Sequence, residues 1–236
     1  MGFFSDFIDN WKLQGEMIEM EKRWKKTDEE AKKFFDTAQS LADHGDETAL
    51  WVVIGRYMFG NSGLRLGIIR DKDYSVDYYK AIEYCEKAIS RGIHLFDKIE
   101  LPTGGFLTVD ESVELDIAWC YYKLKNYEKA EYWYEKAYEQ GIKKALCKVG
   151  QMYVDRTDGK NDYEKAIKYF EKSIKNDWFV PDNEFMIARL HYEGKGFPED
   201  KTKGLEMIRA AAKKGSEIAK EYMKKNDLTM GGMLDD

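Results

Sequence analysis

The chain has 236 residues, 35% of them charged, and a formal net charge of −6 at pH 7. Nucleic-acid binding needs a basic stripe that neutralises phosphates, so this acidic balance argues against DNA or RNA as a partner. No run reaches the ~18 apolar residues of a membrane span, and the first residues lack the basic start of a secretory signal, so we expect a cytoplasmic protein without a membrane span.

The first 27 residues are predicted to form an amphipathic capping helix, residues 1–27. Apolar side chains between Phe4 and Ile18 recur at helical spacing, and acidic residues lie off that stripe. A membrane-surface helix would carry Lys and Arg on its polar face instead. Three roles stay open: a cap on the first repeat, a homodimer contact, or a helix lying in the groove of the array. Capping is the simplest role, because a terminal repeat needs its open apolar face covered.

One phrase recurs along the chain, at residues 81–88, 130–137 and 166–173 and, in a worn form, at 204–211. In each copy two small residues stand seven apart on one helix face, with an aromatic or aliphatic residue between them. A face with small residues lets a second helix approach closely. The copies follow one another at steps of 36 to 49 residues, which indicates a stacked array of helix pairs.

The ends of these helices are also marked. Gly92, Gly141 and Gly215 stand four residues after the second small position, where helices commonly end on a left-handed residue. Asp177 takes this place in the third copy, and Asp enters that conformation more readily than most residues. A second, more apolar helix precedes each phrase, so every phrase helix has a predicted partner.

Together these features resemble the Sel1-like repeat, a relative of the tetratricopeptide repeat with a longer link between its two helices. The third copy fits the repeat pattern best, with Ala145, Gly150, Tyr153, Ala166 and Ser173 at its positions. The resemblance implies an all-α, right-handed solenoid of about four helix pairs over residues 28–225, with capping helices at both ends. The tail, residues 226–236, is expected to be loosely ordered.

The first repeat departs from the repeat pattern through two insertions, residues 61–73 and 93–111. Both are richer in Gly and β-branched residues than the helices around them. We expect them to pair into a small hairpin or to form a lip at one end of the array. Long insertions in an otherwise terse fold are more often functional than accidental.

The resemblance implies a non-enzymatic adaptor that binds a protein or peptide in the concave groove of the solenoid. In this repeat class the first helix of each pair lines that groove, and three positions around each helix crossing point into it. The predicted partner-binding residues are Trp51, Met58, Leu115, Trp119, Tyr122, Gln151, Phe185, Arg189 and Tyr192. The alternative for each is packing against the neighbouring repeat, which is ordinary for buried Leu and Phe.

The family works as an adaptor in assemblies and signalling and, in bacteria, sometimes in toxin–immunity systems. The richness in Lys, Tyr and Ile and the low Pro content fit an AT-rich bacterial genome. We therefore favour a bacterial immunity, antitoxin or signalling adaptor.

No catalytic, cofactor or metal site is predicted. The three histidines are scattered over a linear array whose distant segments do not converge, and no phosphate-binding loop or serine elbow is present. Cys85, Cys120 and Cys147 have no paired spacing, so we expect buried, reduced thiols. The rival hypothesis is a hydrolase-type enzyme whose site is formed by the 61–73 and 93–111 insertions.

Overall fold

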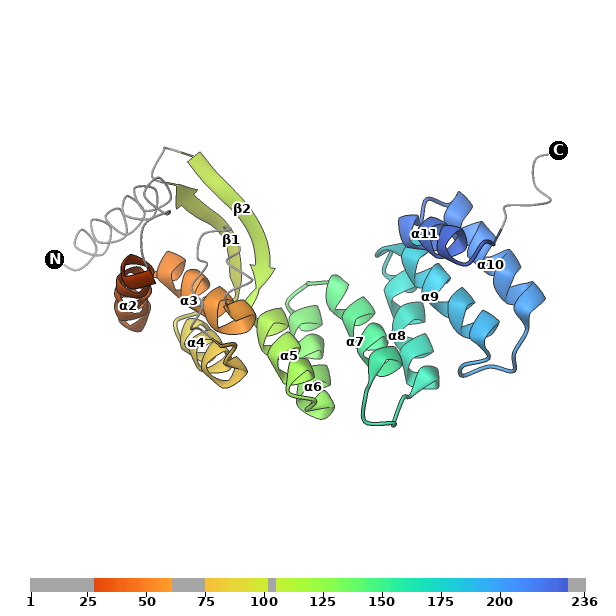
Figure 1. Ribbon diagram of the computed structural model, residues 1–236, viewed down its shortest axis with the longest axis horizontal. Coiled ribbons are helices and arrows are strands. Elements are labelled where there is room, and N and C mark those ends of the chain that lie inside the picture. Colours follow the sequence, from red (N-terminus) through yellow and green to blue (C-terminus); the bar gives the residue numbers. More distant parts are fainter. Residues whose placement is uncertain (1–27, 61–74, 102–104, 229–236) are drawn as a thin grey trace. The chain divides into compact units, whose positions relative to one another are not determined.

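The computed structural model describes residues 28–60, 75–101 and 105–228 (Figure 1). In these residues ten helices follow one another and pack in sequential pairs, which confirms the predicted all-α repeat fold. One two-stranded hairpin interrupts the helices. The chain divides into two compact units, Met1–Trp133 and Tyr134–Asp236, and each is described by itself.

The described elements of the first unit are α2 (Asp28–His44), α3 (Glu47–Phe59), α4 (Tyr78–Ser90), β1 (Leu95–Leu101), β2 (Gly105–Ser112) and α5 (Val113–Lys123), and α6 (Tyr127–Glu139) begins in this unit and continues into the next. Each helix from α2 to α5 packs against the one that follows it in the chain.

The described elements of the second unit are α7 (Lys144–Asp155), α8 (Tyr163–Lys175), α9 (Val180–Glu193), α10 (Lys201–Lys213) and α11 (Glu217–Lys225). Here too each helix packs against its successor, and α11 also contacts α9. The predicted C-terminal helix is therefore present and packs on the last repeat.

The second helix of each pair begins on the same kind of cap. Asp77, Asp162 and Asp200 each accept a hydrogen bond from the backbone N–H three residues later, and Asn126 does the same at α6. Such a cap satisfies one of the backbone donors that a helix leaves unpaired at its start. The sequence analysis did not use this signal, although the Asp or Asn recurs three residues before a lysine in every copy.

The stripe of small residues lies where the sequence placed it, inside the helix pairs. Its members are almost fully buried: Ala81, Ala88, Ala130, Ala137, Ala166, Ser173 and Ala211. At two crossings the approach is closer than alanine permits. A Cβ atom on Gly150 would stand 2.6 Å from Cε1 of Phe170, and one on Gly204 would stand 2.6 Å from the backbone N and Cα of Tyr192.

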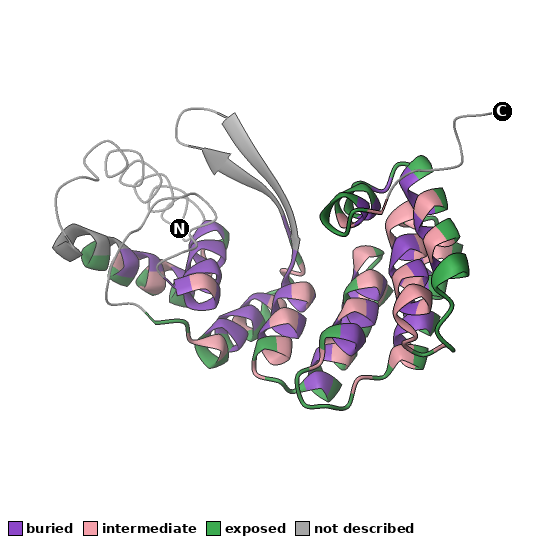
Figure 2. Ribbon diagram, turned by 45° about the vertical axis from the view of Figure 1, so that its right-hand side comes forward, coloured by how far each residue is buried: buried purple, intermediate pink, exposed green. Residues whose placement is uncertain are grey.

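The core of the first unit is centred on α3, which is buried along nearly its whole length (Figure 2). Its sequence is apolar on every side, as expected of a helix surrounded by other elements. It packs between α2 and α4 and also contacts β1. Tyr57 links the two neighbouring helices, because its ring lies edge-on to Phe35 of α2 and stacked on Tyr84 of α4.

The hairpin differs from the expected pairing of the two insertions. β1 and β2 are antiparallel neighbours from Leu95 opposite Ser112 to Leu101 opposite Gly105, so the second insertion pairs with itself. Two strands joined by a short turn need little loop closure, which favours this local pairing. The 61–73 insertion lies outside the described residues.

Several other predictions also fall outside the described part of the chain, namely the roles of the 1–27 helix and the order of the tail beyond residue 228. Within that part, none of the helices has the length and apolar character that crossing a membrane requires. The three cysteines are free thiols, with Cys85 and Cys120 buried and Cys147 half-buried.

The crossing of α9 and α10 provides a test of the close approach. Gly204→Ala should lower the free energy of unfolding by about 1–2 kcal/mol, because overpacking costs about 1–3 kcal/mol and outweighs the helix-propensity gain of about 1 kcal/mol. The atoms in the way belong to the Tyr192 backbone and cannot rotate aside. Urea unfolding measures the change, with the exposed Thr202→Ala of the same helix as control. Equal stability of the two variants would show that the crossing relaxes freely.

Candidate functional site

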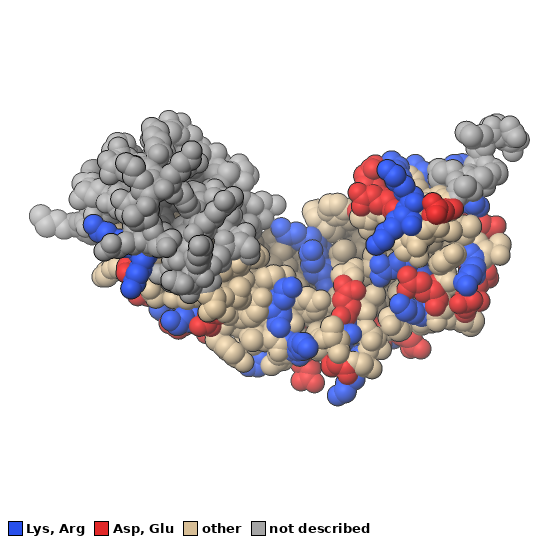
Figure 3. Space-filling model, in the orientation of Figure 1, with Lys and Arg blue, Asp and Glu red and all other residues tan. Residues whose placement is uncertain are grey.

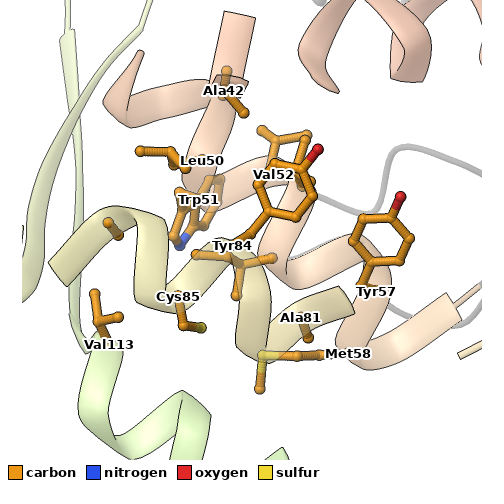
Figure 4. Packing of buried hydrophobic residues seen from close by; sticks show 14 of the residues in the cluster. Ala42, Leu50, Trp51, Val52, Tyr57, Met58, Ala81, Tyr84, Cys85 and Val113 are labelled. Carbon is orange, nitrogen blue, oxygen red and sulfur yellow. The ribbon is translucent and has the colours of Figure 1, made fainter. Parts of the chain in front are cut away.

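Three of the predicted groove residues have buried side chains. Trp51 and Met58 of α3 are 1% and 2% exposed, and Phe185 of α9 is 3% exposed. Figure 4 shows Trp51 and Met58 among the packed side chains of α3 and α4. Residues with so little surface offer nothing to a partner, so their positions fit the packing alternative. The reason is that α3 and α9 each have neighbours on more than one side.

The other six predicted groove residues are half-buried: Leu115, Trp119 and Tyr122 on α5, Gln151 on α7, and Arg189 and Tyr192 on α9. Gln151 donates a hydrogen bond to the Asp155 carboxylate one turn along α7, so it is engaged within its own helix. The remaining residues on α5 and α9 belong to two clusters, one in each unit.

The first cluster, the α5 aromatic patch, consists of Phe59, Tyr78, Trp119, Tyr122 and Lys123. The Trp119 ring lies 5.2 Å from the Phe59 ring and 5.5 Å, edge-on, from the Tyr78 ring, measured between centroids. These contacts hold the indole from two sides while part of it stays exposed. Tilted and edge-on ring pairs of this kind add to stability beyond the area that they bury.

A cation completes the patch. The Lys123 ammonium lies 5.0 Å from the Trp119 ring centroid and 5.8 Å from that of Tyr122. Desolvation raises the pKa of the Tyr78 phenol, so it stays protonated and can donate a hydrogen bond at neutral pH. The patch therefore offers fixed apolar rings with a positive charge and a hydroxyl beside them. Trp, Tyr and cationic groups in this arrangement are what protein interfaces favour.

The second cluster, the α9 arginine cluster, consists of Arg189, Tyr192, Glu193, Lys195 and Tyr222. Lys195 Nζ donates to Glu193 Oε2 at 2.7 Å, and this bond raises the pKa of the ammonium. Arg189 Nε lies 3.6 Å from Glu193 Oε1, which is beyond hydrogen-bonding distance. Burial raises the pKa of the Tyr222 phenol, and the nearby Glu193 and Tyr192 act in the same direction.

A second arginine of the same unit has its carboxylate fully engaged. Arg156 donates from Nε to Asp158 Oδ1 at 3.1 Å and from Nη2 to Oδ2 at 2.7 Å. This two-pronged pairing holds the pKa of Asp158 at about 2. Arg156 and Arg189 are thus one satisfied and one loosely paired guanidinium.

Sequence reasoning missed half of these residues. Phe59 and Tyr78 border the first insertion, and only the fold brings them together against α5. Tyr222 reaches the α9 cluster because α11 packs back on α9. The aromatic residue next to an insertion was a usable signal for Phe59, whereas nothing in the repeat pattern indicates Tyr222.

An acid–histidine pair lies at the base of the hairpin. The Glu114 carboxylate, only 4% exposed, contacts His94 Nδ1 at 2.5 Å and accepts a hydrogen bond from Ser112 Oγ at 3.0 Å. The histidine and the serine contact different oxygens, so this contact set lacks the serine–histidine bond that activates a nucleophile. The group instead ties both ends of the hairpin to α5, together with the backbone bond from Val113 N to His94 O.

The charges and metal ligands of the described residues give no further site. Figure 3 shows Lys and Arg interspersed with Asp and Glu over the described surface of this face. Among the described residues no group of three His, Cys, Asp or Glu side chains is placed to hold a metal ion. The enzyme hypothesis rests on Lys98, Thr103 and Asp110, whose side chains lie outside the described part.

A protein-family model described as "Sel1 repeat" matches four segments of the chain, residues 57–93, 117–142, 143–178 and 184–216, which together make up more than half of it. A comparison with curated proteins finds no match.

Two solved structures are similar. One is a Sel1 repeat protein from Oxalobacter formigenes, at 18% identity and a TM-score of 0.48, covering 86% of this chain and 74% of that chain. The other is a protective antigen of uropathogenic Escherichia coli with an SLR fold, at 16% identity and a TM-score of 0.48. It covers 89% of this chain and 40% of that one.

The paired arginine can be tested by titration. Arg156→Gln should raise the pKa of Asp158 from about 2 toward the ordinary value of 3.8, because the guanidinium is the main cause of the shift. A lowered pKa stabilises the fold above the unfolded value and is lost as pH falls through the folded one, here between about 4 and 2. NMR of the side-chain carboxyl carbon measures it, and an unchanged pKa would contradict the pairing.

Proposed function

Since this chain belongs to the Sel1 repeat family, we propose that it is a non-enzymatic adaptor that binds another protein or a peptide. Sel1 repeats generally mediate protein interactions, so the open question is which surface of this chain makes the contact. The proposal assigns the contact to the exposed faces of the first helices of the pairs, α5 in the first unit and α9 in the second.

The observation that carries the proposal is the state of Trp119. Its ring is fixed by Phe59 and Tyr78 and yet half-exposed. An aromatic ring that is already immobilised loses little conformational freedom when a partner covers it. Trp and Tyr are also the residue types that contribute most strongly to binding when they are desolvated at an interface. Trp119 and Tyr122, with Lys123 over both rings, are therefore the proposed anchors.

In the second unit, Arg189 and Tyr192 of α9 make up the corresponding surface. Both are half-buried, and Arg189 keeps 23% of its side-chain surface exposed. Trp51, Met58 and Phe185 are left out, because they are buried in the cores.

The finer assignment is an immunity, antitoxin or signalling adaptor in a bacterial cytoplasm. It is supported by the low Pro content and the Lys, Tyr and Ile richness, together with the family membership. A homodimer through residues 1–27 is part of the same proposal. The identity of the gene's neighbour would test the immunity assignment, since antitoxins and toxins are usually encoded side by side.

Partner capture tests the proposed surface. Trp119→Ala should reduce capture of the main partner by about thirtyfold, because a desolvated aromatic anchor contributes about 2 kcal/mol or more to binding. Affinity purification from lysate, followed by quantitative mass spectrometry and binding measurements on the purified partner, gives the result.

Two further variants keep the test sharp. Trp119→Ala also removes packing against Phe59 and Tyr78, so Lys123→Ala is measured beside it; this exposed residue can be truncated without opening the core. Tyr79→Ala is the matched control, since Tyr79 is an exposed aromatic residue of α4 (71% exposed) outside the patch. Loss of capture with Tyr79→Ala, or full capture with both other variants, would mean that the partner uses another face.

A further inference from the structure

The α9 arginine cluster has more positive charge than its own carboxylate satisfies. Arg189 and Lys195 share Glu193, and Glu193 is hydrogen-bonded to Lys195 alone. Arg189 Nε is buried and has no hydrogen-bond partner in the structure. A buried donor without an acceptor is unfavourable and uncommon, so it needs an explanation.

The contrast with Arg156 shows that the loose pairing is not a general property of arginines in this unit. Arg156 makes two charge-assisted hydrogen bonds to one carboxylate, which is the geometry that the guanidinium fork prefers. Arg189 has a carboxylate one turn away on its own helix and still makes no hydrogen bond to it from Nε. The Lys195 ammonium draws that carboxylate away from Arg189.

The surroundings of Arg189 suit a ligand that is both anionic and apolar. Tyr192 and Tyr222 lie close enough to act electrostatically on each other and on Glu193. Tyr222 is held in place by its ring contact with the buried Phe185, at 5.4 Å between centroids. The cluster therefore combines an unfilled cationic donor with two tyrosine rings from different helices, α9 and α11.

We propose that the α9 arginine cluster is a subsite for a side-chain carboxylate of the bound partner, an Asp or Glu that pairs with Arg189 while its neighbouring residues contact Tyr192 and Tyr222. The inference rests on the proposed function, because it names the chemistry of the partner segment that the adaptor takes. Charge complementarity decides the occupant: a neutral or basic segment would leave the Arg189 donor unsatisfied, whereas a carboxylate supplies the acceptor it lacks.

Arginine side-chain NMR provides a direct test on the full chain. The probe is the peptide Gly-Glu-Tyr-Glu-Gly, capped at both ends so that only side-chain carboxylates are charged. Its matched control is the same peptide with Gln in place of both Glu. The Nε–Hε signal of Arg189 should shift saturably with the Glu peptide and bind the Gln peptide about tenfold or more weakly, as loss of a charge-assisted hydrogen bond predicts.

Variants of the protein separate a binding role from a structural one. Arg189→Gln should weaken the Glu peptide about tenfold, and Arg156→Gln should leave it within about twofold. Glu193→Gln should instead tighten binding several-fold, because it removes the carboxylate that competes for the two cations. A purely structural role of the cluster gives no such gain. Asp158→Asn, which frees Arg156 in the same way, is the matched control and should change nothing.

Three results would overturn the inference. The first is equal binding of the Glu and Gln peptides, and the second is no gain with Glu193→Gln. The third is binding that appears only after residues 229–236 are deleted, which would give the site to the chain's own acidic residues Asp235 and Asp236. Partner capture that depends on Trp119 but not on Arg189 would remove this inference and leave the proposed function intact.

Discussion

The close approach of the two helices in each pair is the constraint on which the rest of the structure depends. Where the small stripe meets its partner helix, the distance is set by a hydrogen atom or a methyl group, as at Gly150 against Phe170 and Gly204 against the Tyr192 backbone. Helices held this close must bury one whole face against each other. The side chains of the first helices that remain, on α5 and α9, are then available for binding.

The sequence predicted the repeat framework well, because its evidence is local. Two small residues seven apart, a left-handed residue such as Asp177 at a helix end and an apolar partner helix can all be read within one repeat. The hairpin was foreseen only as a loop feature. Its self-pairing depends on which strand is nearest in the chain, a comparison that the Gly and β-branched content of two insertions could not decide.

The candidate site was only partly predictable, and the reason is the number of neighbours. Trp51 and Trp119 occupy comparable positions on first helices, but α3 is surrounded by α2, α4 and β1 and buries its tryptophan. On α5 the tryptophan keeps an exposed part, and its supporting rings come from the ends of α3 and α4. A repeat alignment assigns the same role to both positions and contains no information on how many elements cover each. Tyr222 was missed for the same reason, since it enters the α9 cluster from another helix.

The recurring Asp or Asn cap bears on how such a chain tolerates change. Because Asp77, Asn126, Asp162 and Asp200 each define the first turn of the helix that follows, each helix carries its own starting point. A link that grows or shrinks before the cap therefore leaves the register of the next helix unaltered. The first repeat, with its long link before Asp77, is an instance: new segments can be acquired there during evolution while the helix crossing behind them is preserved.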